Sequence, residues 1–241
     1  MSDHKKVREI LKLKDQAPLV MEPQRSALLI VDAQRYFARP EYAFGQTFER
    51  LVPGSTGGFF ERVAEHVMPN IQRLIEGFRQ ARVPVIYFGA GSHTDDGRDL
   101  PEWLRDFNQL SEMVAGRRAI PPVTDESWQI DDRIAPQTGD VVLNKTSSGP
   151  LNSTKFDQML HNMGISNLVV CGLTTAICVA QTARESADRG FRVVIASDAC
   201  TEMSEEMHIA ALEAFSLTFG RCRTTDQLLE MFNAGPAARS A

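Results

Sequence analysis

The sequence predicts a three-layer α/β domain, in which helices cover both faces of a parallel sheet. Short runs of apolar and often β-branched residues recur along the chain, which is typical of strands buried on both faces. Segments with the helical spacing of apolar residues separate these runs, and a parallel sheet requires this alternation. A length of 241 residues suits one large domain, so we expect residues 1–241 to form a single domain.

The predicted strands are the short apolar runs. The first run begins at Ser26 and ends with Asp32, and it is continuous enough for a strand buried on both faces. The second contains Pro84, which a strand tolerates only near its start. The full set of predicted strands is 26–32, 83–88, 140–145, 167–172, 191–196 and 220–223.

Helices are predicted between these strands. Residues 59–82 have clear helical spacing, and Pro69 within them predicts a kink or a break into two pieces. Capping residues and glycines mark the ends of the other helices. These are a short helix near 103–110, one capped by Asn152 or Ser153 and ended by Gly164, one from about 175 to Gly190, one capped by Ser204 and one opened by Thr225.

Two segments stand outside the alternation. Residues 1–24 form an N-terminal arm, for which two interpretations stay open. It is a short amphipathic helix that packs on the body or on a neighbouring subunit, or a partly ordered arm, and we slightly prefer the second. Residues 89–122 form a long connection, and insertions of this length after a strand are usually functional lids or interface elements.

Composition excludes several classes of partner. The chain has 26 basic and 31 acidic residues and no long basic run, so we expect neither nucleic acid nor an anionic membrane surface as a partner. The apolar runs are too short to span a bilayer and the N-terminus lacks the apolar core of a signal peptide, so we expect a cytoplasmic protein. The four cysteines have no CxxC spacing and are expected to be free thiols.

Cys178 is the candidate nucleophile. It follows the strand 167–172 and falls in the first turn of the next helix. Unpaired N–H groups and the positive end of the helix dipole favour an anion there, so this thiol should ionise more readily than a free cysteine. The alternative is a packing role, because alanines show that one face of this helix lies close against another element.

Two further strand ends carry charged side chains. Asp32 stands where partial desolvation would raise its pKa toward a value useful for proton transfer, although a turn or capping role is the common alternative. Lys145 ends the third strand, and beside a thiol it would hold the thiolate and lower the pKa of the thiol. No second histidine stands at ligand spacing from His93, so we expect no metal site. Trp128 is expected to be a core residue.

These residues, with the segments around them, resemble the isochorismatase-like cysteine hydrolase family. This family includes nicotinamidases, N-carbamoylsarcosine amidase, and ureidoacrylate and biuret amidohydrolases. The resemblance extends from about Ser26 to Phe232. The segments that carry it are Val-Asp-Ala-Gln-Arg-Tyr-Phe at 31–37, residues 136–142 leading to Lys145, Gly-Leu-Thr-Thr-Ala-Ile-Cys at 172–178, and residues 182–184 and 188–190.

The resemblance implies a Rossmann-like domain with a six-stranded parallel sheet and a catalytic triad. In this triad Asp32 is the base, Lys145 steadies the charges and Cys178 attacks. It also implies a cis peptide between residues 173 and 174, which makes an oxyanion hole from the N–H groups of Thr174 and Cys178. Gln34 and Thr174 would orient the substrate and Phe37 would supply an apolar wall. A homo-oligomer, dimer or tetramer, is expected, and no cofactor.

The predicted function is therefore cleavage of a small carboxamide, carbamoyl or ureido C–N bond through a thioester, with release of ammonia or an amine. Two features depart from the family pattern. The metal-binding histidines of nicotinamidases have no counterpart, since His66 lies in a helix, and Ser148–Leu151 stands where the family has a small residue and a phenylalanine. Two alternatives remain: a vinyl ether hydrolase of the isochorismatase type, which needs the aspartate but no thiol, and a non-enzymatic α/β module.

Overall fold

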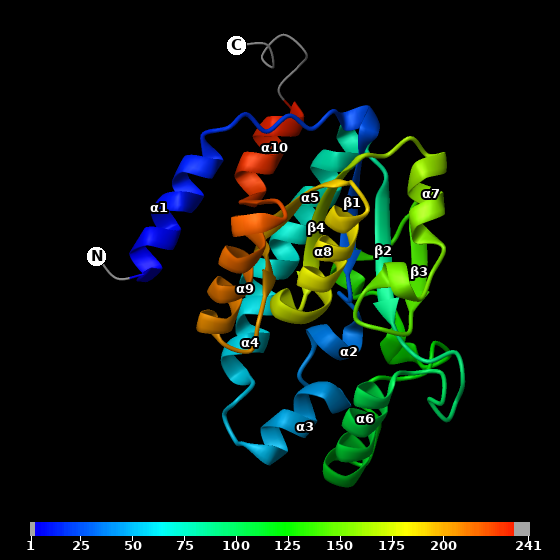
Figure 1. The fold of residues 1–241 in the computed structure, drawn as a ribbon. Helices are drawn as coiled ribbons and strands as arrows, with labels where there is room; N and C mark the ends of the chain where they lie inside the picture. The colour runs from blue at the N-terminus through cyan, green and yellow to red at the C-terminus, as the bar shows by residue number, and fades with distance from the viewer. Residues whose placement is uncertain (1–2, 234–241) are drawn as a thin grey trace.

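The computed structural model describes residues 3–233 and shows a six-stranded, all-parallel sheet covered by helices on both faces (Figure 1). The sheet order is β3-β2-β1-β4-β5-β6. The predicted fold class is thus confirmed. Residues 1 and 2 of the predicted arm and 234–241 of the predicted domain lie outside the described residues.

Each predicted strand is present. The sixth is the shortest and lies at one edge, and the fifth runs five residues beyond its predicted end, where a register shift against β4 accommodates the extra length. The strands are β1 Ser26–Val31, β2 Val85–Ala90, β3 Val141–Lys145, β4 Asn167–Leu173, β5 Arg192–Thr201 and β6 Arg221–Arg223.

The helices form two layers and a lobe. One layer contains α4 Gly57–Arg62, α5 Met68–Gln80 and α10 Thr225–Asn233, and the other contains α7 Phe156–Asn162, α8 Ala180–Asp188 and α9 Glu205–Thr218. At the lower end of the sheet in Figure 1 lie α2 Arg35–Ala38, α3 Ala43–Leu51 and α6 Glu102–Ala115. None of the helices in the described part of the chain is long and apolar enough to cross a membrane.

The sheet separates two apolar cores, and β1 contributes to both because successive side chains of a strand point to opposite faces. Leu28 and Ile30 pack with the α5 layer, whereas Leu29 and Val31 pack with α7, α8 and α9. All of β1 is buried, which explains why its sequence is continuously apolar rather than alternating.

The sheet order changes direction between β1 and β4. From β1 the chain proceeds outward through β2 and β3, and from β4 it proceeds the other way through β5 and β6. In open parallel sheets the carboxyl ends of strands at such a switch point leave a crevice that binds ligands. The crevice of this protein is therefore flanked by Asp32, which follows β1, and by the turn that follows β4.

The helix predicted at 59–82 is present but divided. A π-helical turn, Val63–Val67, joins α4 to α5, and Pro69 lies in the first turn of α5. Proline lacks the N–H that would bond to the preceding turn, and the wider turn accommodates this loss. The predicted break is thus confirmed just before Pro69.

Three local predictions were wrong. The helix predicted to be capped by Asn152 or Ser153 begins later, at Phe156, whose N–H donates to the Thr154 hydroxyl. Asn152 instead lies in a 3₁₀ turn, Pro150–Asn152. Cys200, placed after the fifth strand in the prediction, lies inside it.

The third concerns the N-terminal arm, which is a helix, α1 Asp3–Asp15, packed against α9. The Lys14 ammonium donates to the carbonyls of Ser216 at 2.6 Å and Gly220 at 3.1 Å. The slight preference for a partly ordered arm was wrong, because these cation–carbonyl contacts fix the helix at the C-terminal end of α9.

Candidate active site

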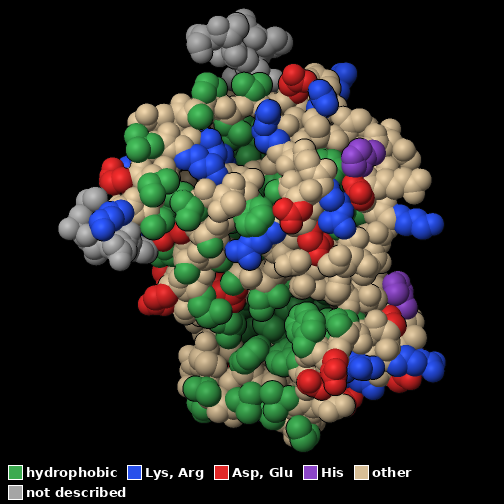
Figure 2. Space-filling view, in the orientation of Figure 1, with side chains coloured by type: hydrophobic (Ala, Val, Ile, Leu, Met, Phe, Trp, Pro, Cys, Tyr) green, Lys and Arg blue, Asp and Glu red, His purple; other side chains and the backbone are tan. Residues whose placement is uncertain are grey.

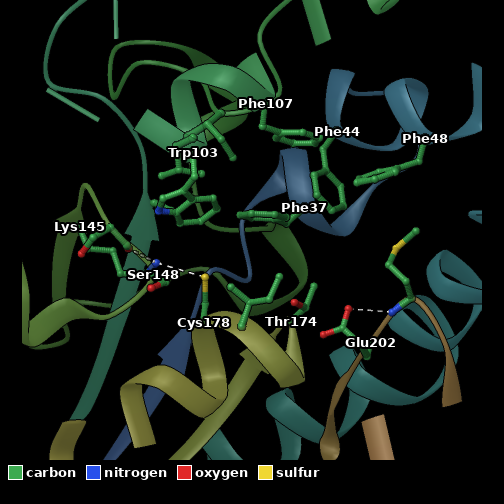
Figure 3. A pocket seen from close by; sticks show the side chains of 16 residues that line it. Phe37, Phe44, Phe48, Trp103, Phe107, Lys145, Ser148, Thr174, Cys178 and Glu202 are labelled. Carbon is green, nitrogen blue, oxygen red and sulfur yellow. Dashed lines mark hydrogen bonds between the residues drawn. The ribbon is translucent and has the colours of Figure 1, made fainter. Parts of the chain in front are cut away.

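Three charged or nucleophilic side chains converge at the crevice. The Lys145 ammonium lies 2.9 Å from Oδ2 of Asp32. It lies 3.5 Å from Sγ of Cys178 (Figure 3). It also donates to the carbonyl of Ser147 at 2.9 Å. Asp32 and Lys145 are fully buried and Cys178 is 8% exposed, so water contributes little to their stabilisation. The structure therefore brings together the three residues of the predicted triad.

Backbone geometry places Asp32 in this cluster. Its φ of 51° lies in the left-handed region, and its N–H donates to the carbonyl of Phe88 in β2 at 2.8 Å. The neighbouring strand approaches so closely that a Cβ on Gly172 would lie 2.0 Å from the carbonyl oxygen of Val31. Only glycine fits there, and its φ of 121° is one that other residues rarely adopt. The close approach sets Asp32 beside the turn that carries the thiol.

Cys178 lies in a π-helical turn, Thr175–Val179, that starts α8. The carbonyl of Thr174 accepts hydrogen bonds from the N–H groups of Ile177 and Val179. The N–H of Cys178, which lies between them in the sequence, does not donate to this carbonyl. The peptide between Leu173 and Thr174 is cis, as the family resemblance implied. Turns of this width are frequent at functional sites.

The electrostatics of the cluster differ in one respect from the prediction. Burial and the nearby charge of Asp32 raise the pKa of Cys178 well above that of a free thiol, and Lys145 lowers it only in part. The expectation of a readily ionised thiol was wrong, because burial and the neighbouring Asp32 outweigh the effect of a position in the first turn of a helix. Burial also raises the pKa of Asp32, against the opposing effect of Lys145.

Lys145 remains charged. Burial alone would lower its pKa, but the interactions with Asp32 and Cys178 outweigh burial and the pKa lies above its ordinary value. The pKa values of Asp32, Lys145 and Cys178 thus all lie above their ordinary values. Transfer of the thiol proton to an ionised Asp32 moves a negative charge from oxygen to sulfur and leaves the net charge of the cluster unchanged. No counter-ion has to enter from solvent for this transfer.

A cavity of about 240 Å³ opens beside the cluster. Figure 2 shows it as a hollow with many hydrophobic side chains, between the sheet and the lobe of α3 and α6. Cys178 and Lys145 line one side, and aromatic side chains lie across from them in Figure 3. The lining residues are Phe37, Phe44, Phe48, Ala90, Trp103, Leu104, Phe107, Ile120, Lys145, Ser147, Ser148, Thr174, Ile177, Cys178, Glu202 and Met203.

The predicted substrate-binding residues divide in two. Phe37 and Thr174 line the cavity, where the prediction placed them. Gln34 does not, because its fully buried amide donates to the carbonyl of Trp128 and accepts from the N–H of Ala90 at 2.7 Å. Gln34 therefore lies outside the cavity lining and joins the segment around Trp128 to the end of β2.

The sequence analysis missed most of the cavity wall. Phe44 and Phe48 stand four residues apart on α3, and Trp103 and Phe107 stand four apart on α6, so each pair faces one side of its helix. This four-residue spacing of aromatic side chains was the sequence pattern from which the cavity wall could have been predicted. Glu202 follows β5, and its carboxylate accepts from the N–H of Ala176 at 2.9 Å.

The other flagged residues lie outside the cavity lining. Trp128 donates from Nε1 to the Asn144 side chain and covers Gly91, so it is a structural residue. His93 contacts the Asn144 amide at 3.1 Å. Within residues 3–233, no three His, Cys, Asp or Glu side chains are grouped so that they could hold a metal ion.

A family model for the isochorismatase domain matches residues 26–227. The chain belongs to the isochorismatase family. Ureidoacrylate amidohydrolase RutB of Methylobacterium radiotolerans is 28% identical over 211 residues, covering 84% of this chain and 78% of the relative. N-carbamoylsarcosine amidase of Arthrobacter sp. is 27% identical over 213 residues, covering 88% of this chain and 73% of the relative. This isochorismatase-family protein is a hydrolase.

Solved structures show the same fold. A cysteine hydrolase from Pseudomonas syringae pv. phaseolicola superposes with a TM-score of 0.73 at 24% identity, covering 90% of this chain and 98% of the other. N-carbamoylsarcosine amidase from Thermoplasma acidophilum superposes with a TM-score of 0.60 at 24% identity, covering 84% and 97%. At this identity the likeness concerns the fold.

Proposed function

We propose that the protein is a cysteine-dependent amidohydrolase that cleaves a small carboxamide, carbamoyl or ureido C–N bond through a thioester. The observation that carries the proposal is the contact of the Lys145 ammonium with both Asp32 and Cys178 at the edge of a cavity. A base, a nucleophile and a fixed cation within hydrogen-bond distance are the groups that acyl transfer by a thiol requires. The amidohydrolases among the relatives support the same reaction class.

In the first half of the reaction, Sγ of Cys178 attacks the amide carbon while its proton passes to Asp32. The carbonyl oxygen becomes an oxyanion, for which the N–H groups of Thr174 and Cys178 are the proposed donors. Asp32 then gives the proton to the departing nitrogen, the C–N bond breaks, and ammonia or an amine leaves. The acyl group remains on sulfur as a thioester.

In the second half, water attacks the thioester carbon and Asp32 accepts a proton from it. The C–S bond breaks, the acid leaves, and Cys178 recovers its proton from Asp32. Lys145 keeps its charge throughout, which stabilises whichever of its two neighbours is anionic at each step. Its contact with the carbonyl of Ser147 holds the ammonium in place while the negative charge moves.

The test is ammonia release across a panel of small amides: biuret, N-carbamoyl amino acids, ureidoacrylate-like acids, nicotinamide and simple carboxamides. We expect Cys178→Ala to lose at least ~10³-fold in turnover, and Cys222→Ala, a matched control in β6, to keep it. Release in the presence of chelator is expected to be unchanged. Ammonia release retained by Cys178→Ala would refute the thioester. No release from any amide by the unaltered protein would instead favour the vinyl ether hydrolase, which needs no thiol.

A further inference from the structure

The wall opposite the thiol is aromatic. Phe37 and Phe44 have ring centroids 4.7 Å apart, and the Phe48 and Phe107 centroids are 5.4 Å apart, so the rings form one continuous contact surface. Trp103 extends this surface to the mouth of the cavity, where it is 49% exposed. Figure 3 shows these side chains facing Cys178 and Lys145 across the cavity. A substrate whose carbonyl meets Sγ places the rest of its structure among these rings.

The lining offers no cation to an anionic substrate. Its only charged residues are Lys145 and Glu202, and Lys145 is already paired with Asp32. Glu202 is 2% exposed, and its carboxylate accepts from two backbone N–H groups, those of Ala176 and Met203. Arg62, which lies near Glu202, donates to a hydroxyl and to backbone carbonyls and does not line the cavity. A substrate carboxylate would therefore be desolvated near another carboxylate.

The volume of the cavity indicates how large a group it can enclose. An apolar cavity of about 150 Å³ in another protein holds one benzene ring. The cavity here measures about 240 Å³, which leaves space for one ring and a short arm that carries the amide. Edge-to-face contacts with the wall would favour an aromatic ring over an aliphatic group of equal size.

We propose that the substrates are amides with an uncharged aromatic group, joined to the amide by a short linker. This inference rests on the proposed function, because it places the scissile carbonyl at Cys178. It distinguishes the protein from a hydrolase of carboxylate-bearing ureides, for which the wall would need a free cation. The rings of α3 and α6 select the substrate, and the strand ends carry the reaction.

The first experiment compares phenylacetamide, 4-(carbamoylmethyl)benzoate and acetamide as substrates. The first two differ only by a carboxylate on the ring. We expect kcat/KM for phenylacetamide to exceed that for acetamide by roughly 10- to 100-fold, the effect of burying one phenyl group. We expect the carboxylate to remove most of this gain. Equal or better turnover of the carboxylate would overturn the proposal, and the proposed function would stand.

Variants of α6 test the role of the wall. Trp103→Ala should lower the phenylacetamide to acetamide ratio of kcat/KM by roughly 3- to 10-fold, because part of the apolar contact is lost. Trp103→Arg should raise turnover of the carboxylate by placing a cation at the mouth. Met113→Ala is the matched control, since Met113 is on the same helix, is 78% exposed and does not line the cavity. An unchanged ratio in Trp103→Ala would contradict the proposal.

A binding measurement separates the two proposals. Calorimetric titration of Cys178→Ala with phenylacetamide and with its carboxylate reports the preference of the cavity without any turnover. Tighter binding of phenylacetamide is expected, and the reverse order would overturn the inference whatever the reaction is. If instead phenylacetamide binds more tightly but no amide is hydrolysed by the unaltered protein, the amidohydrolase proposal fails and the preference for aromatic ligands stands.

Discussion

Replacement of Lys145 by methionine tests whether the Asp32–Lys145 pair is ionised in the native protein. The two charged groups are fully buried and 2.9 Å apart. At an effective dielectric constant of about 20, unit charges at this distance attract by about 6 kcal/mol. Methionine fills a similar volume without the charge, so Asp32 would be left as a buried carboxylate with no cation beside it, and such a group takes up a proton.

Protonation limits the loss of stability. Relative to an unfolded chain with an ordinary aspartate, protonating Asp32 costs about 4 kcal/mol at pH 7 and about 1.5 kcal/mol at pH 5. The folded variant binds one more proton than its unfolded chain in this range, so its stability falls as pH rises, by up to about 1.4 kcal/mol per unit. The lost contact to the carbonyl of Ser147 adds roughly 1–3 kcal/mol at every pH.

The assay is urea unfolding of the unaltered protein, Lys145→Met and the double variant Asp32→Asn/Lys145→Met at pH 5 and pH 7. We expect the difference in unfolding free energy between the first two to grow by up to about 2.7 kcal/mol from pH 5 to pH 7. The double variant should lack this growth and should be more stable than Lys145→Met at pH 7. A difference that is the same at both pH values would show that Asp32 is not an ionised partner of Lys145.

Further predictions concern the approach of the strands, the base and the turn that carries the thiol. Gly172→Ala should lose at least about 4 kcal/mol, or fail to fold, because its Cβ would lie 2.0 Å from the backbone of β1, whereas Gly57→Ala, with open space around it, should change the melting temperature little. The pH profile of kcat/KM should show an acid limb above 3.8, the ordinary pKa of an aspartate, because Asp32 must be unprotonated to act as base and burial raises its pKa; an acid limb at or below 3.8 would contradict this role. Glu202→Ala should cost roughly 1–3 kcal/mol, because the part-buried N–H groups of Ala176 and Met203 lose their acceptor, and it should lower kcat. Glu205→Ala, at an exposed position at the start of α9, should have a smaller effect on both quantities.

Much of the reacting cluster could be predicted because parallel strands present their carboxyl ends at one edge. Asp32, Lys145 and Cys178 each follow an apolar run, and this regularity brings residues more than a hundred positions apart into contact. The pKa of the thiol could not be predicted in the same way. It depends on how completely the lobe of α3 and α6 and the strand ends exclude water, which no local pattern in the sequence states.

The cavity wall was harder to predict because tertiary contacts determine the positions of the chain segments that form it. The Asn108 side chain bonds both the N–H and the carbonyl of Ile120, which ties α6 to the returning chain and orients Trp103 and Phe107. The same limit explains why the sequence did not predict the position of the Gln34 side chain. An amide side chain after a strand end can face the crevice or the protein interior. The amide of Gln34 faces the interior because its oxygen accepts a hydrogen bond from the N–H of Ala90.

The segment between β2 and β3 contributes Trp103, Leu104, Phe107 and Ile120 to the cavity wall, although it contributes no residue to the triad. The reacting groups and this part of the wall thus come from separate parts of the chain. An alteration within residues 91–122 can change which molecules enter without disturbing the groups that react with them. Such a division allows the cavity to be altered toward new compounds by exchanging the α6 part of the wall, and it offers the same route to anyone who wishes to redesign the protein.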